Sequence, residues 1–363
     1  MEEINGAAAG PIARLMRPTR TRRIVRATAY GGGGVGAVGI LTAGLLYGQA
    51  ALAKKNIPLA QSPAPRSDGR YGTENPGPDI RLAVLGDSSA AGFGVDRARD
   101  TTAALLAAGI AERLHRPVSL RCHAVVGATS AGLNPQVRRA VTGTPDIAII
   151  LIGANDVTHR VRVPVAIAHL AKAVTQLREA GAEVVVCTCP DLGTIRPIQP
   201  PLRWLARRWS RDLAAAQTIA AVEAGARTVS LGDLLGPQFR SAPDRMFGAD
   251  RFHPSAIGYA VAAGAILPTA ISALREPSEP IRLGAGEGVR SLVQAAAEAA
   301  DRPGTEVSQA QVSGRDHGPA GRWAELRHRV RLWTERPQDP AAGDSAVPLR
   351  QPGPTGPEPT PAG

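Results

Sequence analysis

Short apolar runs alternate with segments of helical spacing between residues 79 and 276, and this alternation constrains the fold most strongly. Apart from Asp146, the run 146–152 contains only Ile, Ala and Leu, as expected for a strand that is buried on both faces. We predict the other strands at 80–85, 118–126, 183–188 and 228–231, and helices at 101–114, 136–141, 165–179, 203–224 and 255–274. The pattern predicts an α/β domain in which helices cover both faces of a parallel sheet.

Polar and glycine residues follow several of these strands, at the edge where ligands of open parallel sheets bind. Ser88 follows the first strand, Gly127 the second and Asn155 the third, while Asp250 and His253 precede the last helix. Because the carboxyl ends of parallel strands share one edge, the fold would bring these residues together. The shared location is stronger support for a site than any single motif.

The residue types at this edge match the needs of a serine hydrolase, which uses a nucleophile, an imidazole base oriented by a carboxylate, and oxyanion donors. Ser88, in the glycine-rich turn 86–94, is the predicted nucleophile, and Ser89 is its rival. His253 is the predicted base, and Asp250 can reach its Nδ1 across one turn. Pro254 would stiffen this turn and open the helix.

Hydrogen-bond donors for an oxyanion are available from two further turns. Asn155 carries a side-chain amide, and Gly127 offers a backbone N–H with no side chain in the way. The backbone N–H of Ser88 is the third predicted donor. Asp156 is expected to brace its loop rather than take part in the chemistry.

Four blocks together resemble those of the SGNH (GDSL-type) hydrolases: Gly86-Asp87-Ser88, Gly127, Gly153-x-Asn155-Asp156 and Asp250-x-x-His253. The resemblance covers residues 79–276, and the chain resembles an exported, actinobacterial-like member of the family. It implies a flavodoxin-like three-layer α/β/α sandwich with a parallel five-stranded sheet, and hydrolysis of esters without a metal or cofactor. Ser89 departs from the family's usual Leu.

The same resemblance bears on the three cysteines. With the strand order 2-1-3-4-5, Cys122 would lie on the second strand, and Cys187 and Cys189 on the fourth. Three strand spacings of about 4.8 Å separate these strands, which exceeds the reach of a disulfide. Three unpaired thiols are therefore expected.

The chain outside this domain has a distinct composition. A basic cytoplasmic N-terminus is predicted at 1–26, a transmembrane anchor or cleaved signal at 27–53, and a linker at 54–78. The heavier basic flank lies before the apolar segment, which favours a catalytic domain outside the cytoplasm. The alternative is secretion after signal cleavage. A largely disordered Pro/Gly-rich tail is predicted at 277–363, with a basic amphipathic helix at 322–336.

The formal net charge is +11, but no nucleic-acid motif or stacking pattern appears, so nucleic acid is not an expected partner. We predict a monomeric, membrane-tethered serine esterase of the lipase/esterase type that cleaves small-molecule, lipid or carbohydrate esters. The alternative is an O-acetyl esterase or acetyltransferase acting on envelope polysaccharide. The intact set of site residues argues against a third possibility, an inert envelope-binding protein. The loops 156–164 and 191–209 are candidates for shaping the acyl pocket, and the second could form a lid.

Overall fold

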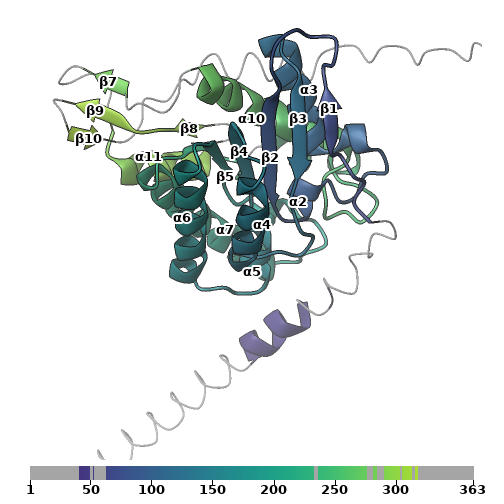
Figure 1. Ribbon diagram of the computed structural model, residues 1–363. Helices are drawn as coiled ribbons and strands as arrows, with labels where there is room; N and C mark the ends of the chain where they lie inside the picture. Colours follow the sequence, from purple (N-terminus) through teal and green to yellow (C-terminus); the bar gives the residue numbers. More distant parts are fainter. Residues whose placement is uncertain are drawn as a thin grey trace, which may run out of the picture.

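The computed structural model describes residues 41–49, 52, 63–232, 236–275, 281–283, 290–302, 305–312 and 315–317 (Figure 1). Residues 41–49 and 52 are helical, and the rest of the predicted segment 27–53 lies outside the described residues. The basic segment 1–26 and the predicted helix at 322–336 also lie outside them. Within the described part, Ala256–Arg275 alone has the length and apolarity to cross a membrane, and it is mostly buried in the domain.

The five predicted strands all form and lie side by side in parallel. Their order is β3-β2-β4-β5-β6, which is the predicted order 2-1-3-4-5. Their bounds are Ile80–Gly86 for β2, Val118–Cys122 for β3, Ile147–Leu151 for β4, Glu183–Cys187 for β5 and Arg227–Val229 for β6.

The prediction of a purely parallel, five-stranded sheet is nevertheless wrong. The sheet has seven strands and is mixed, because β1 (Gly69–Tyr71) pairs antiparallel with β3 and β8 (Glu306–Val307) pairs antiparallel with β6. Strands of two or three residues are too short to display an alternating pattern, so no sequence pattern indicates them. β1 lies in the predicted linker.

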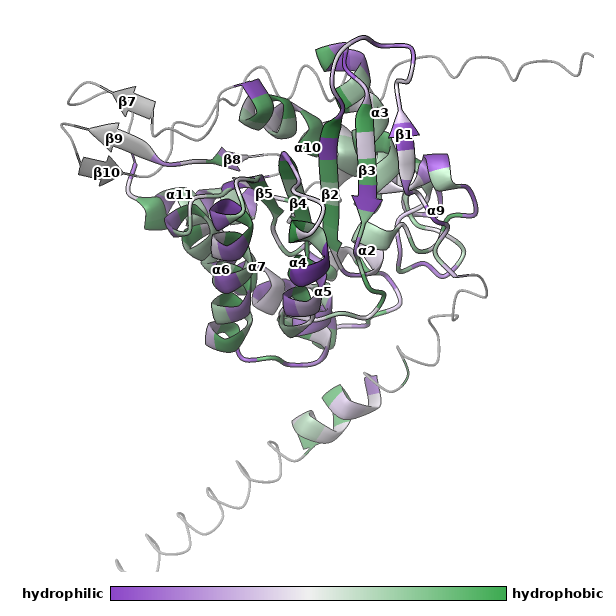
Figure 2. Cartoon of the chain, viewed as in Figure 1, coloured by the Kyte–Doolittle hydropathy of each residue, from purple (hydrophilic) through white to green (hydrophobic). Residues whose placement is uncertain are grey.

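Alternate residues of the central strands point to opposite faces of the sheet, and each face has its own core. Leu82 and Val84 of β2 pack with α3 (Thr102–Leu114) and α10 (Ala256–Arg275). Ala83 and Leu85 pack on the other side with α4 (Leu133–Val141) and α6 (Val163–Glu179). Figure 2 shows the resulting apolar strands between amphipathic helices. Three layers therefore form, as predicted.

Helix α7 (Leu202–Glu223) packs beside α6. The remaining helices before residue 256 are short. They are α2 (Ser88–Ala91), α5 (Ala154–Thr158), α8 (Gly236–Ser241), α9 (Pro243–Met246), and the 3-10 helices η1 (Ala98–Asp100), η2 (Ser130–Gly132) and η3 (Leu192–Thr194).

Part of the predicted tail is folded. Helix α11 (Leu292–Asp301) packs its Ala295 and Ala299 against Val222 of α7, and β8 follows it at the edge of the sheet. A small second sheet contains β7 (Ile281–Leu283), β9 (Ala310–Val312) and β10 (Arg315–His317). We did not predict α11, because its packing contacts are made by alanines. An alanine-rich stretch within a polar region resembles a solvated tail in its composition. Residues 318–363 lie outside the described part.

All three cysteines are free thiols, as predicted. Cys122 ends β3 and Cys187 ends β5, with β2 and β4 between them. Burial raises the pKa of both Cys187 and Cys189, which makes these thiols unreactive hydrophobic groups of the core.

Candidate active site

The turn that carries Ser88 is shaped by a close contact between two backbones. Gly86 ends β2 at a φ of +137°, and a Cβ atom there would lie 1.8 Å from the carbonyl oxygen of Leu151. Only glycine fits this approach. Asp87 then caps α2, because its carboxylate accepts a hydrogen bond from the N–H of Ser89 at 2.9 Å. Ser88 is thus the first residue of α2, at the carboxyl edge of the central strand.

Ser88 and His253, which are 165 residues apart in the chain, meet at hydrogen-bond distance. The Oγ of Ser88 lies 3.0 Å from Nε2 of His253. The Nδ1 of the same ring lies 2.6 Å from Oδ2 of Asp250. The predicted nucleophile, base and orienting carboxylate therefore form one connected chain.

The Asp250 carboxylate is fixed by its own turn. Its Oδ1 accepts hydrogen bonds from the N–H groups of Phe252 and His253, at 3.0 and 2.9 Å. Burial pushes the pKa of Asp250 up, but the hydrogen bonds from His253 and Phe252 outweigh it, so this pKa lies below its ordinary value. Asp250 is therefore an anion at neutral pH, as an orienter of an imidazolium must be.

Aromatic rings hold the imidazole in place. Phe93 and Phe252 both make edge contacts with His253, with ring centroids 4.9 Å apart in each case. Gly94 passes so close that a Cβ atom there would lie 3.1 Å from Cβ of His253. These contacts restrict the rotation of the imidazole ring. We did not predict them from the sequence, because Phe93 and Phe252 belong to different turns.

The three predicted oxyanion donors belong to neighbouring turns. Asn155, on α5, donates from Nδ2 to the carbonyl of Ala128 at 3.0 Å, directly beside Gly127. The turn of Gly127 is tied to the end of β2, since Val125 N–H donates to the Gly86 carbonyl at 3.1 Å. One further N–H of the Asn155 amide remains for a ligand.

Asp156 has the bracing role that we predicted. Its carboxylate accepts from the N–H of Ser130 at 3.0 and 3.1 Å and from the hydroxyl of Ser130 at 2.8 Å. The side chain is fully buried. Asp156 thus fixes α5 against the loop of Gly127, and with it the distance between these two turns.

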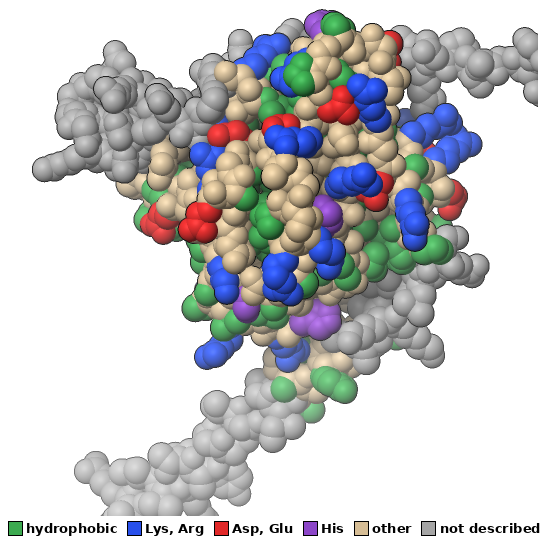
Figure 3. Space-filling model, viewed as in Figure 1, with side chains coloured by type: hydrophobic (Ala, Val, Ile, Leu, Met, Phe, Trp, Pro, Cys, Tyr) green, Lys and Arg blue, Asp and Glu red, His purple; other side chains and the backbone are tan. Residues whose placement is uncertain are grey.

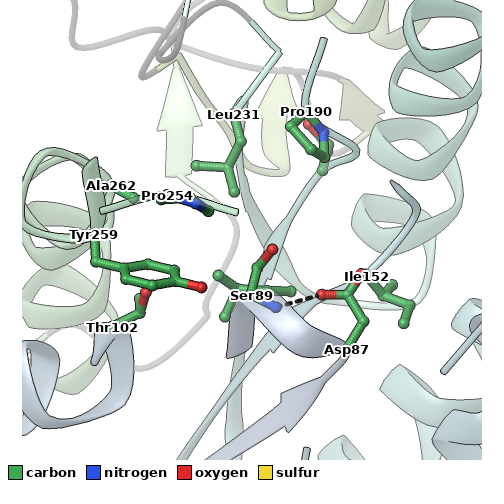
Figure 4. Close-up of a pocket in the computed structure, with 11 residues that line it drawn as sticks. Asp87, Ser89, Thr102, Ile152, Pro190, Leu231, Pro254, Tyr259 and Ala262 are labelled. Carbon is green, nitrogen blue, oxygen red and sulfur yellow. Dashed lines mark hydrogen bonds between the residues drawn. The ribbon is translucent and has the colours of Figure 1, made fainter. Parts of the chain in front are cut away.

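The rival nucleophile Ser89 points elsewhere. Its side chain lines a small cavity of about 40 Å³ together with Thr102 and Tyr259 (Figure 4). Its N–H donates a hydrogen bond to the carboxylate of Asp87. His253 contacts Ser88 and not Ser89. The geometry therefore favours Ser88.

The burial of Asp87 is a second feature of the site that we did not predict. Asp87 is almost fully buried beside the same cavity, with the hydroxyls of Thr102 and Thr188, which have no protein partner among the described residues. Burial raises the pKa of Asp87 to about 6, although the hydrogen bond from Ser89 and the nearby His253 both lower it. In sequence, Asp before Ser indicates only a helix cap, so nothing there revealed this burial.

No group of three or more His, Cys, Asp or Glu side chains is placed to hold a metal ion in the part of the chain that the structure describes. Together, the fold and the site define an α/β protein with a hydrogen-bonded Ser–His–Asp chain at the carboxyl edge of its sheet.

Comparison with known proteins identifies the family. The model of the GDSL-like lipase/acylhydrolase family matches residues 84–261. The GDSL-like esterase Rv1075c of Mycobacterium tuberculosis is 42% identical over 269 residues, which are 71% of this chain and 85% of that protein. The chain therefore belongs to the GDSL-like lipase/acylhydrolase family, and the predicted SGNH (GDSL-type) membership is confirmed.

Two solved structures are also similar, at low identity. An acetylxylan esterase from Geobacillus stearothermophilus is 19% identical with a TM-score of 0.42, covering 52% of this chain and 93% of that one. The psychrotrophic esterase EstA from Pseudoalteromonas sp. is 18% identical with a TM-score of 0.40, covering 55% and 96%.

Proposed function

We propose that this protein is a serine ester hydrolase that cleaves acyl esters through an acyl-enzyme on Ser88. The observation that carries the proposal is the connected chain from Ser88 Oγ through His253 to Asp250, with distances of 3.0 and 2.6 Å. Membership of an acylhydrolase family supports the same activity.

In the acylation step, Ser88 Oγ attacks the ester carbonyl while Nε2 of His253 takes the hydroxyl proton. The anionic Asp250 stabilises the imidazolium that results. The developing oxyanion would accept hydrogen bonds from the N–H groups of Ser88 and Gly127 and from the Asn155 amide. When the tetrahedral intermediate collapses, His253 returns the proton to the alcohol, which leaves.

In the deacylation step, a water molecule takes the position of the alcohol. His253 removes its proton as the water oxygen attacks the acyl carbonyl, and the same three donors stabilise the second oxyanion. Collapse releases the carboxylic acid and returns the proton to Ser88 Oγ. The cycle restores the starting enzyme and uses no cofactor.

The test is hydrolysis of a p-nitrophenyl ester series, from acetyl to palmitoyl, by the full chain in detergent. Ser88→Ala is expected to lower kcat by roughly 10⁴-fold or more, since the acyl-enzyme cannot form. Ser89→Ala is the matched control and is expected to keep at least about a tenth of the activity. Equal loss in both variants would contradict the assignment of Ser88. Activity confined to acetyl esters would indicate the alternative, an O-acetyl esterase of envelope polysaccharide.

We also propose that residues 79–276, together with the flanking strands β1 and β8 and helix α11, form the catalytic domain of a monomer. Residues 27–53 would tether this domain to the membrane, with the domain outside the cytoplasm. The basic flank before an apolar segment, and the helix over 41–49, support the tether. Protease digestion of intact spheroplasts tests this: degradation of the domain without lysis is expected. A protected domain, or one released from washed membranes, would argue against a tether with this orientation.

A further inference from the structure

Most of the exposed large hydrophobic side chains in the described part of the chain lie at the carboxyl edge of the sheet or in the N-terminal helix. The exposed side chains are Leu41, Leu45, Tyr47, Leu52, Val125, Val126, Val165, Trp204, Trp209 and Val293. Val125 and Val126 follow β3, while Val165 and the two tryptophans lie in the first halves of α6 and α7, which follow β4 and β5. Elements that follow parallel strands begin at the carboxyl edge, so all of these except Val293 lie either at the catalytic edge or in the N-terminal helix.

The same edge is basic. Trp209 shares a hollow of about 270 Å³ with Arg160 and Arg162, between the loop after α5 and the middle of α7. Asp156 and Asp212 also line it. Arg207 and Arg208 on α7 pair with Asp191 and Asp212. In the described part of the chain, no carboxylate pairs with Arg160, Arg162 or Arg203. In Figure 3, basic, histidine and hydrophobic side chains gather along the lower edge, and acidic ones lie higher.

The N-terminal helix contacts this edge directly. The side-chain amide of Gln49 donates to the Pro200 carbonyl at 2.7 Å, and its oxygen accepts from the N–H of Leu202 at 3.2 Å. Gln49 thus binds the first turn of α7, two residues before Trp204. The helix lies below the domain in Figure 1, on the side of α2 and α5. A membrane that held residues 27–53 would therefore lie next to the catalytic edge.

We propose that this docking edge, made of Val125, Val126, Trp204, Trp209, Arg160, Arg162 and Arg203, rests on the surface of an anionic lipid bilayer. The proposal depends on the tether proposed above. Tryptophan and arginine are the residues that membrane interfaces favour, because an aromatic ring enters the headgroup layer while a guanidinium binds phosphate. Trp204 is 66% exposed, which leaves its ring available for insertion. The active site would then open toward esters held in the membrane surface.

Quenching of Trp204 by brominated lipid tests the docking. The full chain is reconstituted in vesicles of phosphatidylcholine and phosphatidylglycerol, with Trp209, Trp323 and Trp333 changed to Phe. We expect Trp204 emission to fall about twofold when the acyl chains are brominated, since an interfacial ring lies ~5–10 Å deep. Changing Arg160, Arg162 and Arg203 to Glu should reverse this quenching, because each basic residue changes the affinity for an anionic surface by about fivefold.

The matched control moves the reporter tryptophan to α11, which packs against the far end of α7. Val293 is 65% exposed on α11, beside the amino end of the sheet, so Val293→Trp in a chain without other tryptophans should show no quenching. Equal quenching of the two reporters, or none at Trp204, would overturn the proposal. Protection of Trp204 from acrylamide without quenching by lipid would also overturn it and indicate a protein partner. Hydrolysis of a soluble ester by the same samples reports separately on the esterase proposal, and sedimentation with vesicles reports on the tether.

Discussion

Two turns meet at the active site, and each buries an aspartate close to His253, but the two carboxylates behave in opposite ways. Asp250 accepts three hydrogen bonds, one of them from the imidazole, and its pKa lies below the ordinary value. Asp87 accepts one, from Ser89, and burial raises its pKa to about 6. Burial raises the pKa of both carboxylates, but only at Asp250 do the hydrogen bonds and the charge of His253 outweigh it.

The difference assigns different work to the two residues. Asp250 is an anion throughout the neutral range and can orient and stabilise an imidazolium. Asp87 exchanges its proton near pH 6 and serves the fold as the cap of α2. Asp87, one residue before the proposed nucleophile, thus has a structural role, whereas Asp250, 162 residues beyond Ser88, belongs to the hydrogen-bonded chain of the proposed mechanism.

The largest effect is expected from a substitution in the turn that contains Asp250 and His253. Asp250→Asn should lower kcat for a soluble ester by about 10⁴-fold, because an amide stabilises the wrong tautomer of His253 and leaves its cation without a counter-charge. Steady-state kinetics measure the effect, and circular dichroism checks that the variant is folded. A loss below about tenfold would mean that His253 does not need this partner.

A smaller but still large effect is expected at the nucleophile turn. In Gly86→Ala the new methyl group meets the Leu151 carbonyl at 1.8 Å, so we expect a loss of roughly 4 kcal/mol or more in unfolding free energy. Gly127→Ala is the control, because its φ of +81° is strained but no atom lies near the added Cβ. It should cost only about 1 kcal/mol. Urea unfolding of both variants would show whether the clash, rather than the backbone angle, excludes other residues at 86.

The pH dependence of stability sharpens the contrast between the carboxylates. Because folding raises the pKa of Asp87 from 3.8 to about 6, the folded state holds this proton more tightly. Its favourable contribution is complete below about pH 4 and is lost as the pH rises to about 6. Asp87→Asn keeps the cap and removes the charge. Between pH 4 and pH 7, the unfolding free energy of this variant should therefore rise by about 3 kcal/mol relative to that of the wild type.

Unfolding free energies of the wild type and Asp87→Asn across this range provide the measurement. Parallel curves would show that the pKa of Asp87 is not raised. Asp250→Asn is the opposite control: the folded pKa of Asp250 is lowered, so its contribution is present above about pH 4 and lost as the pH falls through the lower folded value. Its removal should therefore destabilise the protein at pH 7.

The smallest expected effect is at Arg251, which adopts a φ of +55° between Asp250 and Phe252. Arg251→Gly removes the strain of a side chain in this region but adds freedom to the unfolded chain, so stability should change by less than about 1 kcal/mol. Thermal unfolding measures it. A larger loss would show that the arginine side chain itself supports the catalytic turn.

Much of this arrangement follows from the sequence, and the failures have physical causes. The five central strands and the long helices were predictable because runs such as 146–152 are too apolar to lie anywhere but in a buried sheet. Ser88, Asp250 and His253 were predictable because strand ends share one edge. The edge strands β1 and β8 were not, since three and two residues cannot show an alternation.

Long-range contacts were the second kind of failure. The bond from Gln49 to Pro200 joins residues 151 apart, and no local pattern in either segment indicates the other. The burial of Asp87 likewise depends on Thr188 and Tyr259, from strands and helices that pack only in the finished fold. Helix α11 was missed because its alanine contacts resemble the composition of a solvated segment.

The distance along the chain between Ser88 and His253 also determines when the enzyme first becomes active. The sheet must join β2 to β4, β5 and β6, and α10 must dock, before an imidazole reaches the hydroxyl that is 165 residues earlier. A nascent chain that ends before residue 253 therefore contains the proposed nucleophile without its proposed base. The proposed chemistry therefore requires the assembled sheet and the docked α10, and no shorter segment of the chain contains it.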